Sequence, residues 1–138
     1  MTEEQRPTMQ VDVVSAEREL FSGEATAVFA RSVLGEIGLL RGHQPAVLGL
    51  GKAPVRIQDT QGDELHFAVH DGFLECRGDE LTVLADIAEL AVEIDVERAK
   101  EAYARAVRHE QDPEYEGDAA AEKARAQLRL RMAGVEGY

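Results

Sequence analysis

Short apolar stretches separated by turn-forming residues fill the chain from Gln10 to about Ala91. In the run LHFAVH, Leu65 and Phe67 fall on one face of an extended strand, and His66 and His70 fall on the other. Turn signals such as SG, LG, RG, QGD and RGDE separate the stretches, as they do in all-β domains. The expected strands are Val11–Val14, Ala25–Ala30, Ile37–Leu40, Ala46–Leu50, Val55–Ile57, Leu65–Val69, Phe73–Cys76, Leu81–Ala85 and Ile87–Val92. Strands this short and regular predict a compact two-sheet β-sandwich.

The hydrophobic period changes after Ile94 and becomes helical. The recurring apolar positions are Val96, Ala99, Tyr103, Ala106 and Val107. Asp95 stands where an N-cap is needed, and the polar segment that contains Pro113 ends the helix near His109. A second helix is expected from Ala119 to about Met132, which makes an antiparallel helix hairpin.

These patterns predict an α+β fold in two parts. An N-terminal two-sheet β-sandwich occupies residues 1–91, and a C-terminal antiparallel helix hairpin occupies residues 92–138. Alanine supplies most of the packing face of the hairpin; alanine favours helix but buries little area. We therefore expect helices that form readily and dock weakly, which suits an element that occupies two positions. A static α+β protein is the alternative that composition leaves open.

Composition predicts a folded, acidic, cytoplasmic protein. The 138 residues are 44% hydrophobic and carry a formal net charge of −12. That charge repels nucleic-acid backbones and anionic lipid, and no apolar run approaches the ~20 residues that span a bilayer. We expect neither nucleic-acid binding nor direct membrane insertion. The polar first residues do not resemble a signal peptide, and a lone cysteine, Cys76, permits no internal disulfide.

The residue pattern supports neither catalysis nor metal binding. Around the segment GLGKAP, Ala46 stands where a phosphate loop needs its first glycine, and Ala53 stands where it needs a hydroxyl. His66 and His70 are ~13 Å apart on a strand, too far to share one metal ion, and we interpret them as exposed strand histidines. No Ser or Cys lies in a nucleophile motif. We therefore expect a non-catalytic protein with no metal and no required cofactor.

Five segments, in order, resemble the epsilon subunits of F-type ATP synthases. They are VDVVSAERELFSGEA, GEIGLLRGHQPAV, VHDGFLE, LTVLADIAELAVEID and DVERA. The resemblance runs from about Val11 to Arg108 and extends more loosely through the second helix. The family often has Pro where Arg41 stands and Gly where Asp71 stands. Because Asp tolerates left-handed backbone better than most residues, we expect the local bend to survive.

The resemblance implies a mechanical and regulatory role. A subunit of this family sits on the central stalk, against the gamma subunit and the membrane rotor ring of c subunits, and helps to couple rotation to ATP synthesis. Its C-terminal hairpin extends into the catalytic alpha/beta head and inhibits ATP hydrolysis in many bacterial members. The basic second helix here would complement acidic segments of that head. The implied location is the cytoplasmic face of the cell membrane, as a peripheral part of the complex.

The turn-rich segment around His43 is expected to serve structure and subunit contact. In the family the equivalent segment belongs to the β-sandwich and touches other subunits. Its glycines permit positive φ and its proline pre-sets a turn. We expect His43 to hydrogen-bond backbone or to meet a partner. The interface candidates are Glu36, Gly42, His43 and Pro45.

A candidate ATP site lies in the hairpin. Family members that bind ATP there carry an I/L-D-x-x-R-A motif, which the run IDVERA matches, and further arginines resemble that site. The candidate residues are Ile94, Asp95, Arg98, Ala99, Arg105, Arg125 and Arg129. The same positions have structural explanations, since Asp95 suits an N-cap and Ile94 a hydrophobic staple. ATP is therefore a candidate regulatory ligand, and a free-standing nucleotide-binding or adaptor module of the same fold is the alternative function.

Overall fold

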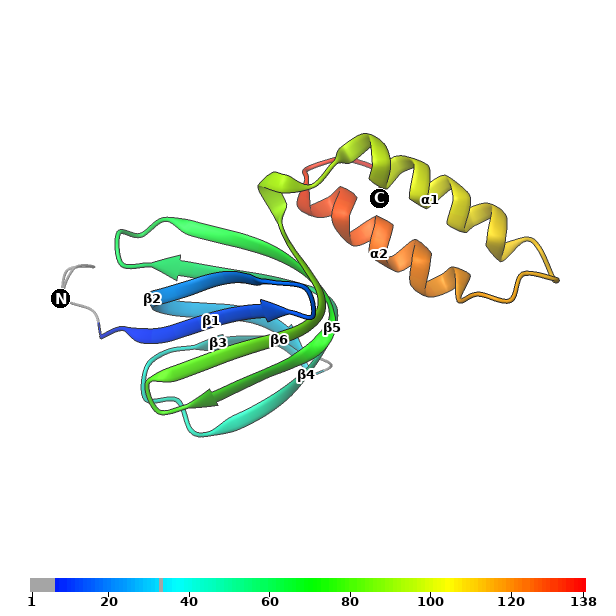
Figure 1. Ribbon diagram of the computed structural model, residues 1–138. Helices are drawn as coiled ribbons and strands as arrows, with labels where there is room; N and C mark the ends of the chain where they lie inside the picture. The colour runs from blue at the N-terminus through cyan, green and yellow to red at the C-terminus, as the bar shows by residue number, and fades with distance from the viewer. Residues whose placement is uncertain (1–6, 33) are drawn as a thin grey trace.

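The computed structural model describes residues 7–32 and 34–138, which form a β-domain followed by a helix hairpin (Figure 1). The strands are β1 (Met9–Ser15), β2 (Glu19–Ser32), β3 (Gly35–Leu39), β4 (Ala46–Asp59), β5 (Glu64–Arg77) and β6 (Glu80–Leu90). The helical elements are the 3₁₀ turn η2 (Ala91–Glu93), α1 (Val96–Glu110) and α2 (Ala119–Met132). This order confirms the predicted α+β class, and the boundary that we placed after residue 91 falls inside η2.

The six strands form one sheet that closes on itself. Their order is β1-β6-β5-β4-β2-β3, and β1 also pairs with β2. Only the β1–β6 pairing is parallel among the pairings of the described strands. The first half of β2 pairs with β1, and its second half pairs with β3 and β4. The predicted sandwich is therefore continuous, because long strands pass from one layer into the other.

The expectation of many short strands was wrong for β4, β5 and β6, each of which joins two predicted stretches. The core-facing positions change parity between Leu50 and Val55 on β4, between Val69 and Leu74 on β5, and between Ala85 and Ala88 on β6. The three shifts are aligned, since Gly51, Asp71 and Asp86 lie between two rows of paired residues that run across all three strands. Ladder pairing continues past this line, so what resembles a turn in the sequence is a bend of the whole sheet.

The bend is sharpest at Asp71 and Gly72. Asp71 has a φ of 63°, which confirms that this aspartate takes the left-handed geometry expected of it, and Gly72 has a φ of 150°. A Cβ on Gly72 would overlap the Leu84 carbonyl oxygen and lie 2.8 Å from the Ala85 Cα. Gly72 is thus required both by its backbone angle and by the close approach of β6.

The core lies between the two layers and is apolar. Its largest fully buried side chains include Phe67, Leu39, Ile57, Leu74 and Leu81. Burial of each such side chain stabilises the fold by about 1.5–3 kcal/mol. Phe67 and Val69 share one face of β5, and both are buried in this core.

Both helices begin at aspartate caps. The Asp95 side chain accepts a hydrogen bond from the Arg98 backbone N–H at 3.1 Å, as predicted. Asp118 caps α2 in the same way through the Ala121 N–H at 3.0 Å. Each cap satisfies an N–H group that the first turn leaves without a helical partner. The predicted hairpin is confirmed, with α2 bounded by the residues that periodicity indicated.

The connection between the helices folds into a compact cluster. The Tyr115 ring stacks on His109 with centroids 3.8 Å apart, and the Tyr115 hydroxyl donates to Glu122. His109 Nδ1 also lies 3.0 Å from Glu122. These hydrogen bonds from Tyr115 and His109 hold the pKa of Glu122 below its ordinary value. Gly117 leaves room for the Tyr115 side chain, since a Cβ at this position would lie 2.5 Å from the Tyr115 hydroxyl oxygen.

The α2 helix covers the outer face of β4 and β5, while α1 packs on α2 at one end of the sandwich (Figure 1). Ala68 and His70 lie on the outer face of β5, yet both are buried. Our interpretation of His70 as an exposed strand histidine was therefore wrong, because a helix nearly fifty residues later in the chain covers it. His66 stays half-exposed.

We predict that Gly72→Ala destabilises the β-domain by roughly 2–3 kcal/mol, since the new Cβ meets backbone at a strained φ. Gly49→Ala is the matched control, because its Cβ would have open space and Gly49 lies on the neighbouring strand β4. Urea unfolding of both variants measures the free energy of unfolding. Equal unfolding free energies for the two variants would contradict this account of the bend.

Candidate functional site

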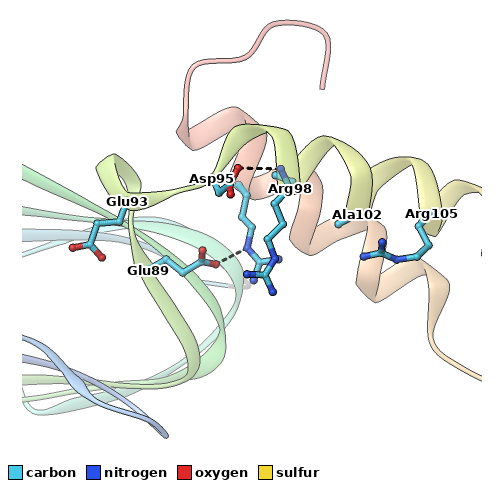
Figure 2. A pocket seen from close by; sticks show the side chains of 8 residues that line it. Glu89, Glu93, Asp95, Arg98, Ala102 and Arg105 are labelled. Atoms are coloured by element: carbon cyan, nitrogen blue, oxygen red, sulfur yellow. Dashed lines mark hydrogen bonds and ion pairs between the residues drawn. The ribbon is translucent and has the colours of Figure 1, made fainter.

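A cavity of about 320 Å³ opens where the end of the sandwich meets the start of the hairpin. Its lining residues are Glu89, Glu93, Asp95, Arg98, Ala99, Ala102, Arg105 and Arg129. Figure 2 shows the labelled acidic residues on the strand side and at the helix start, with Arg98 and Arg105 projecting from α1. The cavity thus has a carboxylate end and an arginine end.

The wall formed by α1 follows from helical spacing. Arg98, Ala102 and Arg105 are four and three residues apart, so they lie on one face of the helix. Ala99 and Ala102 present only methyl groups between the two arginines, which leaves the space open. The Asp95 cap orients the first turn so that Arg98 points toward the end of the sheet.

The structure brings together five of the seven candidate ATP-site residues. Asp95, Arg98, Ala99, Arg105 and Arg129 line the cavity. Ile94 lies beside it, where its backbone N–H donates to the Ala91 carbonyl at 3.3 Å. Arg125 is one turn before Arg129 on α2 and does not line the cavity. Glu89, Glu93 and Ala102 line it as well, and sequence reasoning missed them.

Glu89 is the polar link between the sheet and the hairpin. Its Oε1 atom accepts the Arg129 Nε–H at 2.5 Å and lies 3.0 Å from His70 Nε2. Among the described residues this is the one ion pair between α2 and the β-strands. The carboxylate therefore joins β5, β6 and α2 at the edge of the cavity.

The side chain of His70 contacts Glu89 from the interior. Its side chain is 1% exposed, and Nδ1 is buried without a hydrogen-bond partner among the described residues. Because an ionised carboxylate can only accept a hydrogen bond, His70 Nε2 is the donor to Glu89. His70 thus positions the carboxylate through this hydrogen bond.

The pKa of Glu89 reflects both its burial and its partners. Burial by itself raises the pKa of this carboxyl, but the hydrogen bonds from His70 and Arg129, together with the Arg129 charge, outweigh it and place the pKa below its ordinary value of 4.5. Glu89 is therefore ionised at neutral pH and holds Arg129 at the mouth of the cavity.

The charges of the cavity limit what it can bind. Arg98, Arg105 and Arg129 offer guanidinium N–H groups suited to phosphate oxygens. Glu93 and Asp95 at the other end accept hydrogen bonds and favour amino or hydroxyl groups. A ligand that carries phosphates at one end and donor groups at the other is complementary to both ends.

The four interface candidates do not form one cluster. Gly42, with a φ of 85°, lies beside the β5–β6 turn, where its N–H donates to the Gly78 carbonyl. His43 and Pro45 follow on the same loop, at the end of the sandwich away from the hairpin. Glu36 is exposed on β3 opposite Arg31. The structure thus separates Glu36 from the other three.

His43 has the structural contacts that we expected of it. Its backbone N–H donates to the Leu40 carbonyl at 3.0 Å, and its Nδ1 lies 2.8 Å from the Gln44 carbonyl oxygen. The Cys76 thiol donates to that same carbonyl at 3.4 Å and is 3.5 Å from His43 Nδ1. His43 therefore ties the corner to β5. Residues 7–32 and 34–138 contain no cluster of three or more His, Cys, Asp or Glu side chains placed to hold a metal ion.

An apolar patch on the outer face of the sandwich was not singled out from the sequence. Val47, Phe73 and Leu84 are 67%, 59% and 50% exposed. Phe73 on β5 pairs with Leu84 on β6 and with Gly49 on β4. Val47 lies two residues before Gly49 on β4 and is therefore the diagonal neighbour of Phe73. We call these three residues the outer apolar patch. Sequence reasoning missed it because the parity shift at the bend, which turns Phe73 outward, depends on strand pairing.

The described part of the chain has no helix of the length and apolar character required to cross a bilayer. Its two α-helices, α1 and α2, are short and rich in charge.

Comparisons with known proteins agree along nearly the whole chain. The family described as "ATP synthase, Delta/Epsilon chain, beta-sandwich domain" matches residues 8–91. The ATP synthase epsilon chain of Streptomyces griseus is 45% identical over 127 residues, which cover 92% of this chain and 96% of that protein. The ATP synthase epsilon chain of Brevibacillus brevis is 54% identical over 99 residues, which cover 71% of this chain and 74% of that protein.

A solved structure shares the fold. A chain in the Euglena gracilis mitochondrial ATP synthase, OSCP/F1/c-ring in rotational state 1, aligns with a TM-score of 0.70. The alignment covers 91% of this chain and 78% of that chain at 20% identity. At that identity the likeness shows the fold alone.

We predict that acid loosens α2 through Glu89. Because the folded pKa lies below 4.5, the stabilisation is present above pH 4.5 and is lost as the pH falls through the lower folded value. Hydrogen-exchange protection of α2 amides, compared with β5 amides, measures the effect. Glu89→Gln should lower α2 protection at pH 7 and remove this part of the pH dependence. Parallel acid profiles for the parent and Glu89→Gln would assign the effect to other carboxyls.

Proposed function

Because this chain belongs to the delta/epsilon-chain family of ATP synthases and is an epsilon subunit of the central stalk, we propose that its sandwich fixes it to the rotor and its hairpin regulates ATP hydrolysis. The subunit is not itself a catalyst; it belongs to a complex that works at a membrane. Membership of the family favours this role over a free-standing nucleotide-binding or adaptor module. We place the protein at the cytoplasmic face of the cell membrane.

The gamma subunit is the partner that we assign to the outer apolar patch. Exposed apolar residues gathered on one flat sheet face are characteristic of protein interfaces. Val47, Phe73 and Leu84 form such a group on a side of the sandwich that the hairpin leaves uncovered. The loop with Gly42, His43 and Pro45 lies at the far end from the hairpin, and we assign it to the ring of c subunits.

The observation that carries the regulatory role is the light attachment of α2. The helix rests on small side chains such as Ala68 and is tied to the strands by the Glu89–Arg129 pair. Small contact side chains and one ion pair give a docking free energy that other interactions can balance. A released, basic α2 would enter the acidic surroundings of the catalytic alpha/beta head and block hydrolysis.

We further propose that ATP binds the cavity and favours the docked hairpin. The arginine end receives the phosphates, and the carboxylate end receives the amino and hydroxyl groups of the nucleoside. Because the cavity walls come from β6, α1 and α2 together, a ligand there stabilises the docked arrangement by RT ln(1 + [ATP]/Kd).

We predict that Phe73→Glu weakens binding to an epsilon-depleted ATP synthase by at least about tenfold, because it buries a charge in an apolar interface. Val92→Glu is the matched control: Val92 is 91% exposed but lies on η2, outside the patch. Co-sedimentation with the depleted complex measures binding. Unchanged binding of Phe73→Glu would place the gamma contact elsewhere.

The same assay tests the hairpin. A chain that ends at Ala91 should still bind the depleted complex but should not slow ATP hydrolysis, whereas the full chain should do both. Equal hydrolysis rates with the two bound chains would make the hairpin a passive brace. Failure of both chains to bind would favour the free-standing module.

We predict that Arg98→Ala weakens ATP binding to the full chain by about tenfold or more, since a charge-assisted contact to phosphate is lost. Arg108→Ala is the matched control, because Arg108 is exposed in the last turn of α1 and does not line the cavity. Calorimetry measures the affinity, and circular dichroism checks the fold. Equal affinities of the two variants, or no binding by the parent chain, would contradict the site.

A further inference from the structure

A second cavity, of about 310 Å³, lies on the other side of α2. Arg129 and Arg131 are two residues apart, and about 100° per residue places them on opposite sides of the helix. Arg129 lines the candidate ATP cavity, and Arg131 lines the second one. The α2 residues that line it are Ala124, Gln127, Leu128, Arg131 and Met132.

The strand side of this cavity is also basic. Arg31, Lys52 and Pro54 complete the lining. Ala30 pairs with Val55, and both side chains are buried in the core. The next residues on these strands, Arg31 and Pro54, therefore face outward, and Lys52 lies two residues from Pro54 on the same face. Three cations from β2, β4 and α2 thus converge on one space.

Few carboxylates offset these cations. No Asp or Glu lines the cavity among the described residues. Lys52 pairs with Asp71 at 3.0 Å, and Arg131 donates through Nε to the backbone oxygen of Tyr138 at 2.6 Å. Arg31 has no ion pair or side-chain hydrogen bond with any described residue. In a chain of net charge −12, this leaves a local positive potential that attracts an anion.

The basic lining continues into a neighbouring cavity of about 200 Å³, which shares Arg31 and Pro54. Arg56 and His66 line it, with Glu36 as its one carboxylate. The buried Arg56 Nε atom lies 3.8 Å from Glu64 Oε2, and the guanidinium carbon lies 4.3 Å from the centroid of the Phe29 ring. The guanidinium is partly exposed and adds a fourth cation beside the same space. We call the two joined cavities the basic trough.

We propose that the basic trough is an effector site for an elongated polyphosphate anion. Guanidinium groups at both ends and in the middle match phosphates arranged in a row better than one compact anion. The combined size suits a small ligand rather than a macromolecule. The chemistry is shared by free inorganic polyphosphate and by the phosphate tail of a nucleotide.

Binding there favours the docked hairpin. The walls come from α2 on one side and from β2 and β4 on the other, so the complete site exists only while α2 lies on the sheet. A ligand that binds one of two states shifts the population toward that state. The trough would therefore act in the same direction as the candidate ATP cavity, from the opposite side of α2.

The test is calorimetric titration of the full chain with inorganic tripolyphosphate, together with hydrogen exchange of α2. Arg31→Gln and Arg131→Gln should each weaken binding by about tenfold or more, and the parent chain should gain α2 protection when the anion is added. Arg98→Ala removes a guanidinium from the other cavity and should retain a tripolyphosphate site. Arg108→Gln, a surface change on α1, is the control for net charge.

The remaining outcomes separate the sources and the two sites. Competition of ATP but not AMP with tripolyphosphate in Arg98→Ala would identify a nucleotide phosphate tail as a source. Binding that Arg98→Ala abolishes and that Arg31→Gln and Arg131→Gln leave unchanged would overturn the trough while leaving the candidate ATP cavity intact. Absence of tripolyphosphate binding, or tighter binding of a hexaglutamate peptide, would also overturn the proposal.

Discussion

The Oε1 atom of Glu89 accepts hydrogen bonds from His70 on β5 and from Arg129 on α2, and the position of the hairpin depends on this shared acceptor. His70 can be buried there because α2 covers it, and α2 is aligned there because Arg129 meets a carboxylate held by His70. Buried polar groups fix one arrangement more narrowly than apolar contacts do. Both cavities beside α2 exist because the helix lies in that place.

The bend that crosses β4, β5 and β6 has consequences on both faces of the sheet. Inside, the parity shift lets the same strands supply apolar side chains to both layers, such as Val69 and Leu74 on β5. Outside, it gives one half of β5 the small and polar residues that α2 covers and the other half the exposed Phe73. The surface for a regulatory helix and the surface for a rigid partner are thus made by one distortion of the ladder.

Charge is arranged to suit an element that moves. The chain as a whole is acidic, yet arginines gather on both sides of α2, and Glu89 is the carboxylate that pairs with the helix from the strands. When α2 is docked, small anions can neutralise these cations and so favour the docked position. When α2 is released, acidic partner surfaces can attract the same cations. The alanine contacts set a modest docking free energy on which these charges act.

Local residue patterns predicted the parts of this protein that depend on neighbours in the chain. Both helices, the Asp95 cap and the shared face of Arg98 and Arg105 follow from hydrogen bonds and spacing within a few residues. Tertiary structure alone decided the continuity of β4, β5 and β6, the burial of His70 and the role of Glu89. Those features depend on strand register and on the packing of α2, which lies far along the chain from β5, and register and packing are set by the whole fold.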